Sequence, residues 1–112
     1  MNLTQKIVDG VTVLMIEGRI DCAAASVLEQ ELTGKVALHD HRVVIDFSQA
    51  AYISSAGFRV LLKGLQKSTT VRGRLVLCGI VGKVRQLFEL GGFMDLFTMG
   101  ATQEEGIAAV SF

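Results

Sequence analysis

The chain has 112 residues, of which half are apolar, enough for one compact domain with its own core but not for two. Its 11 basic and 11 acidic side chains cancel, and no cluster of Lys or Arg indicates nucleic acid or an anionic membrane as a partner. The N-terminal segment lacks the features of a secretory signal, and no apolar run is long enough to span a bilayer. We therefore expect a single cytoplasmic domain over residues 1–112.

The two cysteines indicate no redox or metal motif. Cys22 and Cys78 are far apart in the sequence and form no CxxC pair. We expect both to be reduced, buried thiols.

The chain opens with the pattern of a β-hairpin. Residues 3–8 and 11–16 are rich in apolar and β-branched side chains, and Asp9-Gly10 lies between them. An Asp-Gly pair favours a tight turn because glycine accepts positive φ.

A helix and a buried strand follow. Asp21 precedes an alanine-rich stretch with apolar residues at helical spacing, so it is a candidate N-cap for a helix that ends near Gly34. Residues 42–47 form a nearly continuous apolar run, which predicts a central strand.

Residues 55–67 carry the clearest helical pattern. One face is apolar and the other polar, which predicts a helix with one packed and one solvated side. The packed positions are Phe58, Leu61, Leu62 and Leu65, and the polar ones are Arg59, Lys63 and Gln66.

The last third predicts a strand, a helix, a short strand and a final helix. The strands cover residues 74–78 and 96–99, and the intervening helix runs through residues 84–88 to the glycines at 91–92. The stretch 102–105 has the spacing of a capping box, so a last helix runs toward Val110. The order ββαβαβαβα predicts an α/β fold with a mixed sheet of four to five strands.

Residues suited to catalysis are sparse. Ser55 lacks the leading glycine of a G-x-S-x-G nucleophile turn, and no histidine follows His41 to act as its base. His39 and His41 have no further ligands nearby to complete a metal site. The sequence contains no phosphate-binding glycine motif. We expect no enzymatic activity, cofactor or metal.

Ser55 has two possible roles at the start of its helix. A serine in this position is most often the N-cap, which accepts a bond from an unpaired backbone N–H. If Ser54 is the cap instead, the Ser55 hydroxyl faces outward and is open to modification. A phosphate there would meet the positive end of the helix dipole, with Arg59 one turn away.

Five stretches of the chain, one of them around this serine, share features with a known family. They are residues 17–21, 43–48, 52–62, 74–79 and 84–90. Together they resemble the STAS domain, which includes the bacterial anti-sigma factor antagonists. The resemblance implies a single STAS domain.

The resemblance also implies a phosphorylation site. The family motif reads Asp-Ser-Ser/Thr-Gly-Leu with the first serine modified, and Ser55 matches that serine while Gly57 matches the glycine. Ser54, Ala56 and Phe58 stand where the family has Asp, Ser or Thr, and Leu. Residues around Ser55 are then expected to contact the partner: Asp21, Ser54, Ala56, Gly57, Phe58 and Arg59.

The implied function is partner switching. The unphosphorylated antagonist sequesters an ATPase-type serine-kinase anti-sigma factor and so frees the sigma factor. Phosphorylation at Ser55 breaks the complex, and a serine phosphatase resets it. We expect a monomer or weak homodimer. The alternatives are a STAS scaffold subunit of a signalling assembly and a module that senses a nucleotide or another small ligand near Ser55.

Overall fold

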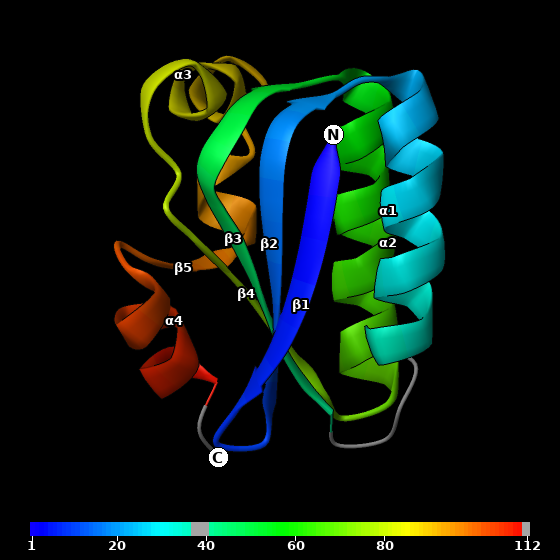
Figure 1. Ribbon diagram of the computed structural model, residues 1–112, viewed down its shortest axis with the longest axis vertical. Helices are drawn as coiled ribbons and strands as arrows, with labels where there is room; N and C mark the ends of the chain where they lie inside the picture. Colours follow the sequence, from blue (N-terminus) through cyan, green and yellow to red (C-terminus); the bar gives the residue numbers. More distant parts are fainter. Residues whose placement is uncertain (37–40, 111–112) are drawn as a thin grey trace.

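The computed structural model describes residues 1–36 and 41–110 (Figure 1). The predicted element order is confirmed. The elements are β1 (Asn2–Val8), β2 (Val11–Ile20), α1 (Cys22–Val36), β3 (Arg42–Ile53), α2 (Ser55–Thr70), β4 (Arg74–Cys78), α3 (Gly82–Leu90), a 3-10 turn (Met94–Leu96), β5 (Thr98–Gly100) and α4 (Gln103–Ala109).

The five strands form one mixed sheet in the order β1-β2-β3-β4-β5. The β1–β2 pair is antiparallel and the other pairs are parallel. Asp9 (φ 52°) and Gly10 (φ 78°) both have positive φ, as the two central residues of a type I′ hairpin turn require. The predicted hairpin and mixed sheet are therefore confirmed.

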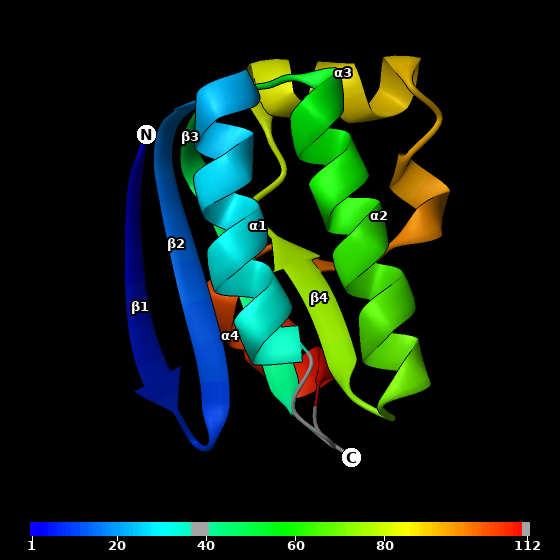
Figure 2. The ribbon, with the colours of Figure 1, turned by 90° about the vertical axis from the view of Figure 1, so that its right-hand side faces the viewer.

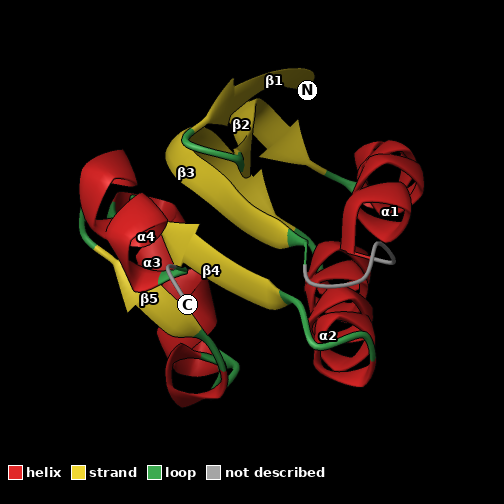
Figure 3. Ribbon diagram, turned by 90° about the horizontal axis from the view of Figure 1, so that it is seen from below, coloured by secondary structure: helices red, strands yellow, loops and turns green. Residues whose placement is uncertain are grey.

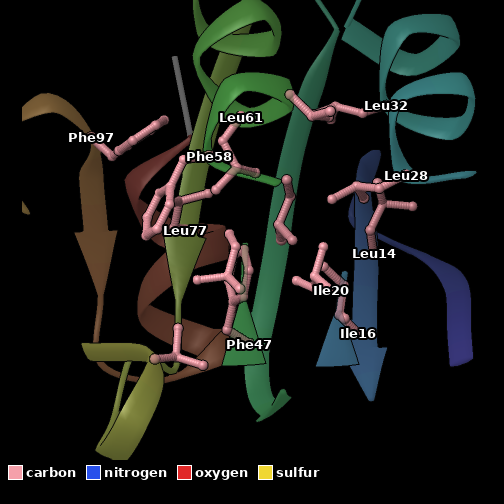
Figure 4. Packing of buried hydrophobic residues seen from close by; sticks show 14 of the residues in the cluster. Leu14, Ile16, Ile20, Leu28, Leu32, Phe47, Phe58, Leu61, Leu77 and Phe97 are labelled. Carbon is pink, nitrogen blue, oxygen red and sulfur yellow. The ribbon is translucent and has the colours of Figure 1, made fainter. Parts of the chain in front are cut away.

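Helices cover both faces of the sheet, α1 and α2 on one side and α4 on the other (Figures 1 and 3). The larger core cluster includes side chains of α1, α2 and the strands that face these helices (Figure 4). A smaller cluster includes residues of β2, β3 and β4 and Val110. Strands with both faces buried explain the continuous apolar run that begins β3.

Two strands are longer than the sequence pattern predicts, and another is displaced. β2 continues to Ile20 and β3 to Ile53, because the two strands go on pairing through two register shifts that interrupt the alternating pattern. The last strand begins at Thr98, since a 3-10 turn occupies residues 94–96.

The prediction of two buried cysteines is half wrong. Cys78 is fully buried in β4, but Cys22 is exposed. Cys22 is the first residue of α1, where its side chain faces solvent while Ala24 and Ala25 in the same turn face the core. Both thiols are unpaired.

Two helix ends follow their sequence signals. The glycine pair ends α3, and Gly92 takes the left-handed conformation with φ 73°. The Thr102 hydroxyl caps α4 by accepting the N–H of Glu105 at 3.2 Å. Over the described ranges, no helix is both long and apolar enough to cross a membrane.

Candidate functional site

The residues singled out in the sequence meet at one end of the sheet. β2 and β3 run parallel and stop together, and the helices α1 and α2 start from their ends (Figures 1 and 2). The backbone N–H of Ser54 donates a hydrogen bond to the carbonyl of Ile20 at 2.9 Å. This bond holds the start of α2 beside Asp21, the residue that follows Ile20.

Asp21 is exposed and caps α1. Its carboxylate accepts the backbone N–H of Ala24 at 2.9 Å, which confirms the predicted cap. The same position leaves a carboxylate at the surface close to the start of α2.

Ser54, and not Ser55, is the N-cap of α2. Its backbone is extended (φ −83°, ψ 168°), and its hydroxyl accepts the N–H of Gly57 at 3.2 Å. The Ser54 carbonyl accepts the N–H of Phe58 at 3.1 Å, so it closes the first turn. Ser54 is 9% exposed, so its side chain is committed to the helix and contributes little to the outer surface.

Ser55 is the first helical residue and is exposed. The backbone N–H groups of Ser55 and Ala56 have no carbonyl one turn earlier in the helix to bond. The first turn of α2 contains no acidic residue, so no side chain of that turn offsets the positive end of the helix dipole. A negative group on the Ser55 hydroxyl would therefore be stabilised.

Arg59 lies one turn further along α2, also exposed. Among the described residues the structure shows no ion pair that engages its guanidinium. Residues i and i+4 of a helix are neighbours on its surface, so Arg59 is within reach of a phosphate on Ser55.

Gly57 and Phe58 are part of the core. A Cβ atom on Gly57 would lie 2.7 Å from Cγ1 of Ile53 and 3.0 Å from Cγ2 of Ile20, so this glycine allows α2 to approach the sheet closely. Phe58 is 7% exposed, and its ring stacks on Phe93 with centroids 4.4 Å apart. Direct contact of Phe58 with a partner was expected, but the aromatic packing turns this side chain inward.

The pairing of β2 and β3 adds two neighbours that sequence reasoning missed, the exposed Arg19 and the half-buried Tyr52. Arg19 and Tyr52 are opposite each other in the register, and the Arg19 guanidinium lies 4.3 Å from the centre of the Tyr52 ring. Arg19 lies two residues before Asp21, and Tyr52 lies two residues before Ser54. The signal that would have found them is the strand register, which the register shifts obscure in the sequence.

Asp46 lies in the middle of β3, away from this end of the sheet. One of its carboxylate oxygens accepts the N–H of Ser48 at 2.8 Å, and the other accepts the side-chain amide of Gln103 at 2.8 Å. The carboxylate therefore orders the middle of β3 and connects it to α4.

The described residues contain no group of three or more His, Cys, Asp or Glu side chains placed to hold a metal ion. His41 is hydrogen-bonded through Nε2 to the hydroxyl of Thr12 at 2.7 Å. His39 lies outside the described residues.

Comparison with known proteins identifies the family. The model of the STAS domain matches residues 2–106. BtrV of Bordetella bronchiseptica, a candidate anti-sigma factor antagonist, is 38% identical over 109 residues, 97% of this chain and 94% of BtrV. The anti-sigma-F factor antagonist RsfB of Mycobacterium tuberculosis is 30% identical over 105 residues, 91% of this chain and 83% of RsfB.

A solved structure shows the same fold. The Bacillus cell fate determinant SpoIIAA in its phosphorylated form superposes with a TM-score of 0.72 at 20% identity, covering 98% of this chain and 100% of SpoIIAA. With the matching domain model and the two sequence relatives, the chain belongs to the STAS domain family and is a relative of the bacterial anti-sigma factor antagonists.

Proposed function

We propose that this protein is an anti-sigma factor antagonist of the cytoplasm whose binding is switched by phosphorylation of Ser55. Unphosphorylated, it sequesters an ATPase-type serine-kinase anti-sigma factor. The kinase phosphorylates Ser55 and is released, and a serine phosphatase restores the binding form. The antagonist names of BtrV and RsfB support the role.

The observation that carries this proposal is that two adjacent serines have different roles, one as helix cap and the other as an exposed hydroxyl. Ser54 supplies the cap and is buried, whereas Ser55 is exposed and its hydroxyl is not needed to form the helix. A kinase could therefore modify Ser55 without breaking a bond of the fold. SpoIIAA, which shares the fold, has been solved in a phosphorylated form.

The added phosphate would act on the surface. It brings roughly −1.5 to −2 charges at neutral pH to a helix end whose first turn has no acidic residue. Within the chain, the N–H groups of the first turn and Arg59 favour it. A partner docked over Ser55 would instead have to desolvate the phosphate or place its own negative charges beside it. Either effect weakens binding. Binding changes without a change of fold.

The partner surface centres on the exposed residues at this end of the sheet. Asp21, Ser55 and Arg59 are exposed and Ala56 is half-buried, so these four are the direct contacts. Ser54 and Gly57 are buried and act by shaping the helix start.

Intact-mass measurement tests the switch. The protein is incubated with ATP and each serine-kinase anti-sigma factor encoded by the genome that carries this chain. We expect one kinase to add a single phosphate, and the Ser55→Ala variant to gain none. The matched variant Ser54→Ala should still be phosphorylated. A chain that gains no phosphate from any of these kinases, or a Ser55→Ala variant that still gains one, contradicts the assignment.

A further inference from the structure

We propose that β1 pairs with β1 of a second copy of this chain, forming a weak antiparallel dimer centred on Gln5. The inference does not depend on Ser55 or on the proposed antagonist role. It rests on the edge of the sheet and on what lies to either side of that edge.

β1 is an unusually open edge strand. It stands at one end of the strand order, and Figure 2 shows it at the border of the sheet. It has seven residues without proline, and it pairs with β2 in unbroken register from Asn2 to Val8. β5, at the opposite border, has three residues. A long, regular edge exposes a row of backbone donors and acceptors that another strand can pair.

A twofold axis at Gln5 uses the whole strand. Each Gln5 then faces its own copy, Leu3 faces Ile7 of the second copy, and Thr4 faces Lys6 of the second copy. Directly opposed residues of an antiparallel pair point to the same face of the sheet, with Cβ atoms about 4.5–5.5 Å apart. Both faces of β1 offer complementary groups in this register.

On the face toward α1, the register places an apolar side chain against an apolar groove. Ile7 is 61% exposed, although isoleucine is among the most hydrophobic amino acids and is usually buried. The groove, about 280 Å³, lies between β1 and α1 and is lined in part by Met1, Leu3, Leu14 and Val27. Met1 (38% exposed) and Val27 (50% exposed) are themselves unusually open. Ile7 of the second copy, opposite Leu3, would cover this groove, and the twofold axis repeats the contact.

On the other face, the two Lys6 side chains lie diagonally across the twofold axis, and each one can turn away from the other toward Glu17 of the opposite chain. Lys6 is the only charged residue of β1, and the structure shows no ion pair for it among the described residues. Lys6 of the second copy would oppose Thr4 and lie diagonal to Asn2. Asn2 is paired in register with Glu17 and donates its side-chain amide to the Glu17 carboxylate at 3.1 Å. The Lys6 ammonium would thus approach Glu17 of the other chain, twice per dimer.

Sedimentation velocity over a concentration series tests the dimer. We expect the wild-type protein to sediment increasingly as a dimer as concentration rises. Lys6→Glu turns the attraction between residue 6 of one chain and Glu17 of the other into a repulsion, and it should raise the dimer dissociation constant about tenfold, since two symmetric pairs are affected. Lys83→Glu, the same charge change on α3, should leave it unaltered. The double variant Lys6→Glu/Glu17→Lys should recover the wild-type value.

Crosslinking tests the register separately. In a Cys22→Ser background, Gln5→Cys should form a disulfide-linked dimer under mild oxidation, whereas Ser26→Cys, exposed on α1, should not. A wild-type protein that stays monomeric at its highest soluble concentration overturns the dimer. Equal dissociation constants for Lys6→Glu and Lys83→Glu, or equal crosslinking at positions 5 and 26, overturn the register.

Discussion

The hydroxyl oxygen of Ser54 accepts the backbone N–H of Gly57 at 3.2 Å, and this single bond separates the roles of two adjacent serines. Removing an N-cap hydroxyl typically costs about 1 kcal/mol. We therefore expect Ser54→Ala to lower the free energy of unfolding by about 1 kcal/mol. Ser55→Ala, at an exposed position, should change it by less than about 0.5 kcal/mol. Urea denaturation of both variants measures the difference, and a larger loss for Ser55→Ala would contradict the assignment of the cap.

The close approach of α2 to the sheet depends on Gly57. A methyl group there would clash with Ile53 and Ile20, so Gly57→Ala should lower the free energy of unfolding by about 1–3 kcal/mol through overpacking. Gly34→Ala is the matched control, because nothing lies within 4 Å of a Cβ atom at that helical position. It should raise stability by about 0.5–1 kcal/mol. Equal changes in melting temperature for Gly57→Ala and Gly34→Ala would show that α2 does not pack tightly on the sheet at Gly57.

Arg59 should matter only after phosphorylation. An i, i+4 pair between a phosphate on Ser55 and Arg59 should contribute about 0.5 kcal/mol. Arg59→Ala should therefore lower the melting temperature of the phosphorylated protein more than that of the unphosphorylated one. Arg85→Ala, which breaks an exposed pair with Glu89 on α3, should affect both forms alike. Phosphorylated proteins that melt identically with and without Arg59 would rule out the pairing.

The two thiols should differ sharply in reactivity. Burial, reinforced by the negative charges of Asp46 and Glu104, raises the pKa of the Cys78 thiol to about 12 from its ordinary value of 9.0. Cys22 is exposed. Iodoacetamide at pH 8 should therefore alkylate Cys22 in the folded protein and Cys78 only after unfolding, because the thiolate is the reactive form. Peptide mass mapping that finds both sites modified in the folded state would contradict this.

The raised pKa of Cys78 also predicts a pH dependence. The folded state holds the thiol proton to a higher pH than the unfolded state does, so this contribution to stability is complete below pH 9 and is lost as pH rises toward 12. Cys78→Ala should show a smaller fall in the free energy of unfolding over that range. An equal or steeper fall in the free energy of unfolding of Cys78→Ala would contradict the raised pKa of the Cys78 thiol.

Sequence patterns located the elements best where apolar runs are bounded by glycine. β4 has the predicted bounds, because its apolar run stands between Gly73 and Gly79. The second half of β3 was missed, since the small and polar residues from Ser48 to Ala51 carry no strand periodicity. These residues are held in the sheet by pairing with β2, a long-range contact that no local pattern reports.

Local sequence patterns also predicted part of the candidate site. The serine pair, Arg59 and the cap formed by Asp21 follow from capping chemistry and helical spacing, which are local. The place of Asp21 in the partner surface was implied by the resemblance to the STAS domain. Phe58 was assigned both to the packed face of its helix and to the partner surface, and its burial against Phe93 decides for packing. The Arg19–Tyr52 contact depends on strand register and could not be predicted from spacing.

The affinity of the protein for its kinase, measured before and after modification of Ser55, tests the central claim most directly. Isothermal titration calorimetry compares the unphosphorylated protein, the phosphorylated protein and Ser55→Asp, with Ser54→Ala as the control that keeps Ser55 intact. We expect tight binding by the unphosphorylated protein and at least about a tenfold loss for the phosphorylated form, as a buried, unpaired charge at an interface costs 1.4 kcal/mol or more. Ser55→Asp should lose part of that affinity. Equal affinities of the phosphorylated and unphosphorylated proteins would contradict a switch at Ser55.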